Sequence, residues 1–167
     1  MGDLNPLLAR GSAATLRALR DAGVDALIVP DLPAGEDRQV ERQAADAGLG
    51  LAFLVTPNTS PARLERAIRA STAFLYVVPI YGVTGARDRV AETTRPLLER
   101  IRAVVDGRRP VAVGFGVSRP EHVRELAPAV DGIIVGSAIV AALDAGGPSA
   151  VGTLVGDLAR ATEHTPA

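Results

Sequence analysis

The segment Asp131-Gly-Ile-Ile-Val-Gly-Ser-Ala138 joins a run of apolar residues, a glycine turn and the start of an apolar helical pattern. Near-continuous apolar runs of this length are typical of strands in a parallel sheet that is covered on both faces. The chain contains five such runs: Ala26 to Pro30, Leu51 to Thr56, Phe74 to Ile80, Val111 to Gly116 and Gly132 to Gly136. Each is followed by a turn signal and then by helical periodicity, which predicts a series of β/α units.

Helix start and stop residues separate these predicted strands. Ser60-Pro61 provides a cap and a proline at the first helical position, and Ser118-Arg-Pro-Glu121 fits a capping box. Ser12 can cap a helix that ends near Gly23. Residues Pro96 to Val105 carry apolar side chains spaced for one face of a further helix.

Two architectures accommodate parallel β/α units with right-handed crossovers. One is a doubly wound five-stranded sheet of the flavodoxin type, and the other is part of an eight-stranded β/α barrel. The tripeptide Asp-Ala-Gly precedes two of the strands, at 21–23 and 46–48, which agrees with a repeated unit in either architecture. Length alone favours the doubly wound sheet, and in both cases residues 1–167 form a single domain.

The charged and metal-binding residues exclude several classes of function. Eighteen basic and nineteen acidic residues leave a net charge of −1, so we expect neither nucleic-acid binding nor attachment to an anionic membrane. All the basic residues are arginine, so the chain has no lysine for a Schiff base or for attachment of pyridoxal phosphate. Because there is no cysteine and there are only two histidines, we expect no metal site.

The start of the chain and its apolar runs predict a cytoplasmic protein. Residues Met1-Gly-Asp-Leu-Asn-Pro6 lack the positive cluster and the apolar core of a secretory signal. No apolar run approaches the length that spans a bilayer.

Glycine residues gather at the predicted carboxyl ends of the strands, where ligands bind in α/β proteins. Backbone N–H groups beside glycine can approach an anion closely, and a helix that begins there adds the positive end of its dipole. Gly114, Gly116 and Gly136 with Ser137 have this pattern, which indicates either a phosphate site or simple tight turns. The segment Gly82-Val-Thr-Gly85 is typical of a polar lid over a ligand, or else of an ordinary surface loop.

Other side chains near these strand ends have two candidate roles each. Asp31 is the one carboxylate at a predicted strand end, and it is either a general base or a capping residue. Tyr76 and Phe115 flank the expected mouth, where they either pack in the core or contact a substrate. His122 is interpreted as a solvated residue in a first helical turn.

Four of these segments resemble, in order and spacing, the tryptophan synthase alpha chain family. They are Gly23-Val-Asp-Ala-Leu-Ile-Val-Pro-Asp-Leu-Pro33, Gly82-Val-Thr-Gly85, Gly114-Phe-Gly-Val-Ser118 and Asp131-Gly-Ile-Ile-Val-Gly-Ser-Ala138. The likeness begins at Asn5-Pro6 and covers nearly the whole chain. It implies a partial (β/α)₈ TIM barrel in which the five strands correspond to strands 4–8.

The resemblance also implies an activity and a site. Members of the family cleave indole-3-glycerol phosphate to indole and glyceraldehyde 3-phosphate, a carbon–carbon lyase step of tryptophan biosynthesis, and pass indole to a beta chain that holds pyridoxal phosphate. We therefore expect a phosphorylated substrate, the beta chain as partner and no cofactor in this chain. The residues implied to bind the substrate phosphate are Gly82, Thr84, Gly85, Gly114, Gly116, Gly136 and Ser137, with Tyr76 and Phe115 near the rest of the substrate.

The chain departs from the family because it does not match the front portion of the barrel. A barrel typically has about 250 residues, whereas this chain has 167 and matches from near the end of the third strand. The family's catalytic glutamate and aspartate belong to the unmatched front portion, so we expect the isolated chain to be catalytically deficient, with Asp31 the remaining candidate. Unpaired edges on the first and last strands also predict self-association, unless the front portion covers them.

Two other functions are compatible with the residues. Glycine loops retained without the acid and base favour a non-catalytic phosphate-binding or regulatory partner of a beta chain. Another phosphate-binding barrel, such as an indole-glycerol-phosphate synthase or a phosphoribosyl isomerase, is the third candidate. The presence of both Gly82-Val-Thr-Gly85 and Pro30-Asp-Leu-Pro33 argues against it.

Overall fold

The computed structural model describes residues 1–79, 90–114 and 116–163, without the side chains of residues 90–93. These residues form a five-stranded sheet in which every neighbouring pair of strands is parallel. The strands are β1 (Ala26–Ile28), β2 (Gly50–Val55), β3 (Leu75–Val77), β4 (Val111–Gly114) and β5 (Gly132–Ile134). All five fall on the apolar runs of the sequence, which confirms the predicted strands apart from their exact ends.

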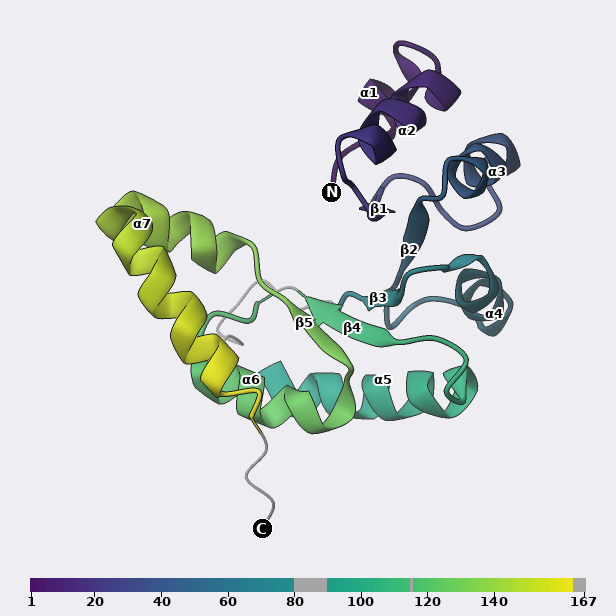
Figure 1. Cartoon of the computed structure of the whole chain (residues 1–167). Helices are drawn as coiled ribbons and strands as arrows, with labels where there is room; N and C mark the ends of the chain where they lie inside the picture. The colour runs from purple at the N-terminus through teal and green to yellow at the C-terminus, as the bar shows by residue number, and fades with distance from the viewer. Residues whose placement is uncertain (80–89, 115, 164–167) are drawn as a thin grey trace.

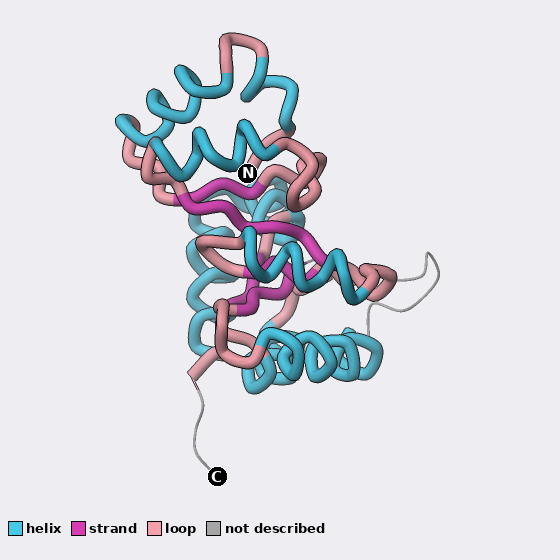
Figure 2. Tube along the Cα trace, turned by 90° about the vertical axis from the view of Figure 1, so that its right-hand side faces the viewer, coloured by secondary structure: helices cyan, strands magenta, loops and turns pink. Residues whose placement is uncertain are grey.

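The order of the strands decides between the two architectures. Neighbours in the sheet follow the chain, β1-β2-β3-β4-β5, whereas a doubly wound sheet reverses its order at a switch point. The strands form a curved wall with helices along its convex side (Figures 1 and 2). This arrangement is part of a (β/α)₈ barrel, and the doubly wound sheet that length alone favours is wrong.

Helices connect the strands, and several begin where the sequence predicts. Their bounds are α1 Leu4–Leu8, α2 Ser12–Asp21, α3 Arg38–Asp46, α4 Pro61–Ala70, α5 Val90–Val105, α6 Pro120–Leu126 and α7 Ser137–Arg160, with a short 3₁₀ helix at Ala127–Ala129. Ser60 caps α4, because its hydroxyl accepts a hydrogen bond from the N–H of Arg63. Ser12 is the first residue of α2 rather than its cap, and its hydroxyl donates to Gln43.

Alternation along the strands separates the helix-covered face from the concave face. Val77 and Val113, which are paired across β3 and β4, belong to one buried cluster with Leu98 of α5. Tyr76 and Ala112 are also paired, and they lie on the opposite face of the same strands. The hydrophobic core therefore lies between the sheet and its helices, and the remaining strand residues line the concave side.

The two Asp-Ala-Gly tripeptides end α2 and α3 in the same way. Gly23 and Gly48 have positive φ angles of 90° and 71°, a conformation that residues with a Cβ rarely adopt. After each glycine the next residue donates its N–H back to the last helical turn, as Val24 does to the carbonyl oxygen of Leu19 at 3.0 Å. The repeat seen in the sequence is thus a helix C-cap that turns the chain into the next strand.

Two local features differ from the predictions. Ser118 does not cap α6, whose N-cap residue is Arg119. Instead, the N–H of Ser118 donates to Nδ1 of His122 at 3.4 Å. His122 is therefore a contact of this loop and is buried, with 4% exposure, rather than solvated. The start of α3 was not marked by any predicted cap, yet the carboxylate of Asp37 accepts two backbone N–H groups of its first turn.

Helix α7 is bent near its middle. Gly146 and Gly147 have non-helical backbone angles and Pro148 follows them, so two shorter helices meet there (Figure 1). By length and apolar composition alone, α7 is the one helix within the described ranges that could cross a membrane. The bend leaves pieces at residues 137–145 and 148–160, each shorter than the about 20 residues that a spanning helix needs. The two pieces therefore do not form a continuous span.

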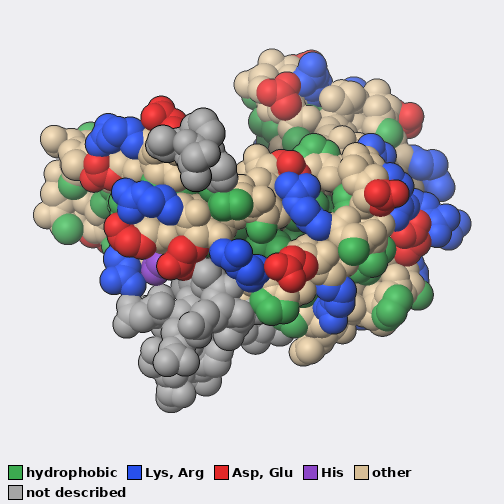
Figure 3. Space-filling view, turned by 90° about the horizontal axis from the view of Figure 1, so that it is seen from below, with side chains coloured by type: hydrophobic (Ala, Val, Ile, Leu, Met, Phe, Trp, Pro, Cys, Tyr) green, Lys and Arg blue, Asp and Glu red, His purple; other side chains and the backbone are tan. Residues whose placement is uncertain are grey.

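Charged side chains of both signs are mixed on the surface. On the face in Figure 3, arginine and acidic side chains alternate rather than forming separate patches. Some pairs lie within one turn of a helix, such as Arg124 and Glu121 of α6, whose charged atoms are 3.1 Å apart. This face therefore presents no extended field of one sign.

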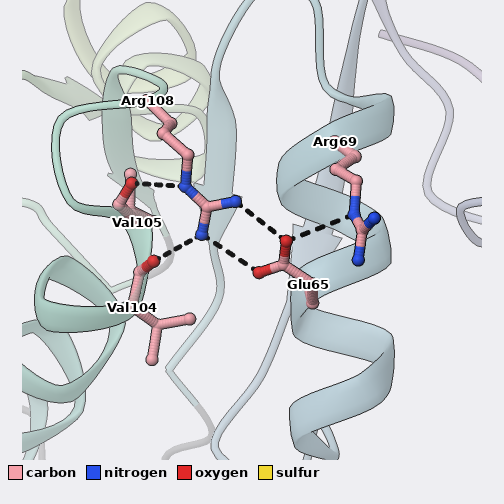
Figure 4. Close-up of polar contacts among 5 residues, drawn as sticks. All are labelled: Glu65, Arg69, Val104, Val105 and Arg108. Carbon is pink, nitrogen blue, oxygen red and sulfur yellow. Dashed lines mark hydrogen bonds and ion pairs between the residues drawn. The ribbon is translucent and has the colours of Figure 1, made fainter.

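An arginine joins two helices on the convex side (Figure 4). Arg108 follows α5 and donates to the carbonyl oxygens of Val104 and Val105 in its last turn, at 2.6 and 3.1 Å. The same guanidinium donates to both carboxylate oxygens of Glu65 on α4, at 2.8 and 3.0 Å. Nε of Arg69, one turn further along α4, is 3.2 Å from the same carboxylate. Arg108 thus caps α5 and fastens it to α4.

This bridge predicts a pH-dependent contribution to stability. The Arg108 guanidinium lowers the pKa of the Glu65 carboxyl below its ordinary value of 4.5. The contribution of the bridge to the free energy of unfolding is therefore complete above pH 4.5 and is lost as the pH falls through the lower pKa of the folded protein. In urea unfolding, Glu65→Gln should differ from the wild type more at about pH 7 than at about pH 3. An equal difference at both pH values would contradict this, and the exposed Glu99→Gln is the control.

Candidate functional site

The carboxyl ends of β3, β4 and β5 lie side by side on the curved wall. The parallel register places Tyr76, Ala112 and Gly132 in one row across the three strands, so all three lie on the concave face. The loop after β4 passes through Gly116, and β5 leads through Gly136 into α7. The residues that follow these strands therefore share one end of the concave face.

Four residues predicted to contact the substrate line one cavity at this end. Tyr76 comes from β3, Gly116 from the loop after β4, and Gly136 and Ser137 from the start of α7. The cavity has a volume of about 190 Å³ and is lined by Met1, Tyr76, Gly116, Val117, Ile134, Gly136 and Ser137. Among the described lining residues, the hydroxyls of Tyr76 and Ser137 are the polar side-chain groups, and backbone amides are further polar groups that a ligand can meet.

The amino end of α7 supplies backbone donors beside this cavity. The carbonyl oxygen of Gly136 accepts the N–H groups of Ile139 and Val140 at 2.9 and 3.2 Å, which closes the first turn. The N–H groups of Ser137 and Ala138 come before these bonds and have no acceptor within the helix. The first turn contains no acidic residue. The donors and the positive end of the helix dipole together favour an anion at this position.

The loop after β4 combines a left-handed glycine with contacts to a buried histidine. Gly116 has a φ angle of 81°, in the left-handed region that favours glycine. Nδ1 of His122 accepts the N–H of Ser118, and Nη2 of Arg119 is 3.3 Å from Nε2 of the same ring. His122 therefore positions the loop that carries Gly116. The sequence signal for this role is the spacing of four residues between Ser118 and His122 at the start of α6. The capping-box interpretation assigned Ser118 to Glu121 and did not consider His122.

Tyr76 lies across Gly114 on the neighbouring strand. A Cβ atom added at Gly114 would lie 2.2 Å from Oη of Tyr76 and 2.6 Å from its Cε2, far inside van der Waals contact. Tyr76 is only 3% exposed, and burial raises the pKa of its phenol, so the hydroxyl stays protonated near neutral pH. Gly114 is thus the residue that leaves room for the ring, and it supports the wall of the cavity rather than lining it.

Asp31 has a structural contact in this fold. Its carboxylate oxygens accept the N–H of Leu4 at 2.9 and 3.1 Å, at the start of α1. An anionic group at this position satisfies the first amide of the helix and opposes the positive end of its dipole. Asp31 is absent from the lining of the cavity. The structure therefore favours the capping role of the two roles considered for it.

Four of the predicted site residues lie outside the described part of the chain: Gly82, Thr84, Gly85 and Phe115. Their contacts with phosphate and with the rest of the substrate stay predictions, as does phosphate binding by the other residues. Within residues 1–79, 90–114 and 116–163, no group of three or more His, Asp or Glu side chains could hold a metal ion.

Comparisons with known proteins agree on one family. The family model of the tryptophan synthase alpha chain matches residues 1–160. The tryptophan synthase alpha chain of Acaryochloris marina is 42% identical over 146 residues, which cover 87% of this chain and 54% of that relative.

Solved structures share the fold. A structure of Mycobacterium tuberculosis tryptophan synthase in space group F222 has a TM-score of 0.86 and 38% identity, covering 97% of this chain and 61% of the matched one. The tryptophan synthase α2β2 complex of Pyrococcus furiosus gives a TM-score of 0.82 and 36% identity. The match covers 93% of this chain and 62% of the matched chain. The chain thus spans between 54% and 62% of the length of these proteins.

The contact between Tyr76 and Gly114 predicts that a methyl group added at Gly114 strongly lowers the stability of the fold. Gly114→Ala should lower the free energy of unfolding by about 1–3 kcal/mol, since the buried ring must move. Gly132→Ala, on the same face of β5, is the matched control, because its Cβ would meet Ala112 at an ordinary 3.5 Å. Urea unfolding of both variants measures the difference.

A double-mutant cycle separates this clash from a general effect of alanine. In a Tyr76→Leu background, which removes the ring, Gly114→Ala should cost clearly less than in the wild type. An equal cost in both backgrounds would show that Tyr76 does not determine the requirement for glycine.

Proposed function

This chain belongs to the tryptophan synthase alpha chain family, and we propose that it forms the phosphate-binding part of a lyase that cleaves indole-3-glycerol phosphate to indole and glyceraldehyde 3-phosphate. The observation that carries this proposal is the cavity at the ends of β3, β4 and β5, where Gly116, Gly136 and Ser137 meet. Because the chain spans just over half of the relative from Acaryochloris marina, the complete activity requires more than these residues.

The phosphate of the substrate binds at the amino end of α7. The N–H groups of Ser137 and Ala138 donate to its oxygens, and the helix dipole stabilises its negative charge. The hydroxyl of Ser137 adds a donor from the same lining. Gly116 lets the loop after β4 approach the ligand without a side chain. We extend this set to Gly82, Thr84 and Gly85, as the family resemblance implies.

The rest of the substrate lies along the concave face. Tyr76 and Ile134 line the cavity on the side of the sheet, and they offer an aromatic ring and an apolar side chain to the indole group. Phe115 is the further aromatic residue that the family resemblance places there. Binding of the phosphate and of the ring together would fix the position of the glyceryl carbon between them.

Cleavage needs two proton transfers, and the described lining of the cavity contains no carboxylate. The bond between the indole ring and the glyceryl group breaks when the ring carbon gains a proton and the adjacent hydroxyl loses one. Asp31 accepts the N–H of Leu4 and does not line the cavity, and the chain has no lysine for an imine route. The acid and the base are therefore expected from the front portion of the family, and the isolated chain should be deficient in catalysis.

The partner that we propose is a tryptophan synthase beta chain. The structural neighbour from Pyrococcus furiosus is described as an α2β2 complex. Pyridoxal phosphate belongs to the beta chain in this proposal, because no lysine is present here to hold it. The proposed cleavage and the use of indole by the beta chain belong to tryptophan biosynthesis, and a cytoplasmic location stays part of the proposal.

A second candidate function is a non-catalytic partner that binds phosphate and regulates a beta chain. The observation that favours it is a cavity built for an anion whose described lining contains no carboxylate. In this alternative, a phosphorylated ligand at α7 alters how the chain docks, and no carbon–carbon bond is broken.

Phosphate binding is tested with Ser137→Asp. A carboxylate at this position occupies the anion site, while an acidic residue in a first turn favours the helix, so the variant should stay folded. Calorimetric titration with glycerol 3-phosphate should show that affinity falls by about tenfold or more. Thr153→Asp adds the same charge at an exposed position of α7 and is the control. Equal affinity of Ser137→Asp and the wild type would place the anion elsewhere.

Catalytic deficiency is tested by the release of indole. The isolated chain should release indole from indole-3-glycerol phosphate at a rate indistinguishable from that of the Ser137→Asp variant, since proton transfer is absent from both. Release at rates near those of a complete alpha chain would contradict this. If the inactive chain changes the activity of a beta chain, and the Ser137→Asp variant does not, this result would favour the regulatory function over the lyase.

A further inference from the structure

A buried histidine lies behind the cavity at the ends of β3, β4 and β5. His122 is in the first turn of α6 and is only 4% exposed. It is absent from the lining of the cavity, so a ligand there does not contact its ring. Burial of an imidazole is costly unless its nitrogens are hydrogen-bonded. The partners of the two ring nitrogens therefore indicate what this residue does.

Each ring nitrogen of His122 faces a hydrogen-bond donor. The N–H of Ser118 is directed at Nδ1, with 3.4 Å between the nitrogens, and Nη2 of Arg119 is 3.3 Å from Nε2. A guanidinium has donors and no acceptor, and a neutral imidazole accepts at one nitrogen only. The ring cannot accept from both partners at once. Its tautomer therefore decides which of the two contacts is a hydrogen bond.

The two donors differ in the alternatives that they have. Arg119 is exposed, so water can solvate its guanidinium in place of the ring. The N–H of Ser118 belongs to the backbone, and it reaches another acceptor only if the loop itself moves. The tautomer that accepts at Nδ1 and carries its proton on Nε2 satisfies the donor with fewer alternatives. In this tautomer the ring holds the loop.

The bond to Ser118 fixes the backbone that lines the cavity. Gly116 and Val117 come directly before Ser118, and both line the cavity. A glycine can adopt many backbone conformations, so the φ angle of 81° at Gly116 depends on fixed points around it. Val117, which is 4% exposed, is one such point, and Ser118 on the His122 ring is the next.

Helix α6 provides a rigid support for His122. Val123 and Leu126 are each 1% exposed and belong to the same buried cluster as Leu98 of α5. The place of the imidazole is therefore set by the hydrophobic core. A continuous series of contacts leads from this core through His122 and Ser118 to Gly116.

We propose that His122, in the tautomer whose Nδ1 accepts the N–H of Ser118, is a positioning residue of the phosphate site. Its lone pair at Nδ1 holds the Gly116 loop in the conformation that receives the ligand. The residue is not catalytic, because it touches neither the ligand nor the reacting atoms. This inference deepens the proposed function and rests on it.

Three variants of His122 test the role of the lone pair in the full chain. In His122→Asn, the side-chain oxygen takes the position of Nδ1. His122→Gln places its amide near Nε2 instead, and His122→Leu has no acceptor. In calorimetric titration with glycerol 3-phosphate, the Leu and Gln variants should bind about three- to tenfold more weakly, which is the effect of one ordinary hydrogen bond. The Asn variant should bind within about twofold of the wild type.

Two controls separate positioning from loss of stability. Val123→Ala removes buried methyl groups from α6 and lowers the free energy of unfolding, but it keeps the bond to Ser118, so its affinity should equal that of the wild type. In His122→Leu, the backbone amides of Ser137 and Ala138 should still shift in nuclear magnetic resonance spectra when the ligand is added. The amide of Gly116 should shift less than in the wild type, because the loop alone has lost its fixed point.

The tautomer itself is measured without any change at His122. The chain has two histidines, so His164→Gln leaves His122 as the single imidazole. Its ¹⁵N spectrum at about pH 8, where an ordinary imidazole is neutral, should show the proton on Nε2. A proton on Nδ1 would overturn the proposal.

The binding data distinguish this inference from the proposed function. Wild-type affinity in a folded His122→Leu, or equal loss of affinity in the Asn and Leu variants, would overturn the inference alone. So would rescue by Gln but not by Asn, because that result assigns the acceptor to Nε2. If the wild type itself does not bind glycerol 3-phosphate, the proposed function fails, and the inference fails with it.

Discussion

Parallel pairing of strands in chain order is the constraint on which the rest of this structure depends. Each strand must be reached by a crossover of the same hand, so the described helices that connect the strands fall on the convex side and the strand ends fall at the same rim. Tyr76, Gly116 and Ser137 are far apart in the sequence, yet they line one cavity because the strands β3, β4 and β5 are neighbours. A reversal of strand order at any point would separate them.

Much of the fold could be predicted from the sequence, because the strands and helix ends of β/α units have local sequence patterns. Apolar runs located all five strands, and glycines such as Gly23 and Gly48 marked helix ends through their positive φ angles. What escaped prediction depends on contacts that are distant in sequence or on competing partners. The choice between a barrel wall and a doubly wound sheet rests on strand order, which periodicity does not contain, so the partial barrel was predicted from the family resemblance and is confirmed by the strand order. Ser118 was interpreted as a helix cap, but its N–H donates a hydrogen bond to the His122 ring instead.

Local sequence patterns also left the role of a residue open where the same residue type can act in catalysis or in helix capping. Asp31 had the features of either a base or a cap, and the amide of Leu4 lies at its carboxylate, 27 residues away along the chain. The place of Gly136 and Ser137 at the start of α7 was predictable, because a helix that begins after a buried strand exposes its first amides in any context, whereas anion binding there stays a proposal. The requirement for glycine at 114 was not, since it arises from a tyrosine on another strand.

The fold separates two tasks that a complete lyase combines. Holding a phosphate needs backbone amides and a helix dipole, and the proposed site draws both from the five-stranded wall, whereas proton transfer needs side chains placed opposite the bond that breaks.

The most direct measurement of the central claim is a nuclear magnetic resonance titration of the backbone amides with glycerol 3-phosphate. Shifts that saturate together at Gly116, Ser137 and Ala138, while amides of α4 stay unchanged, are the result that this account predicts. Shifts centred on another part of the chain, or no saturable shift at these three residues, would contradict it.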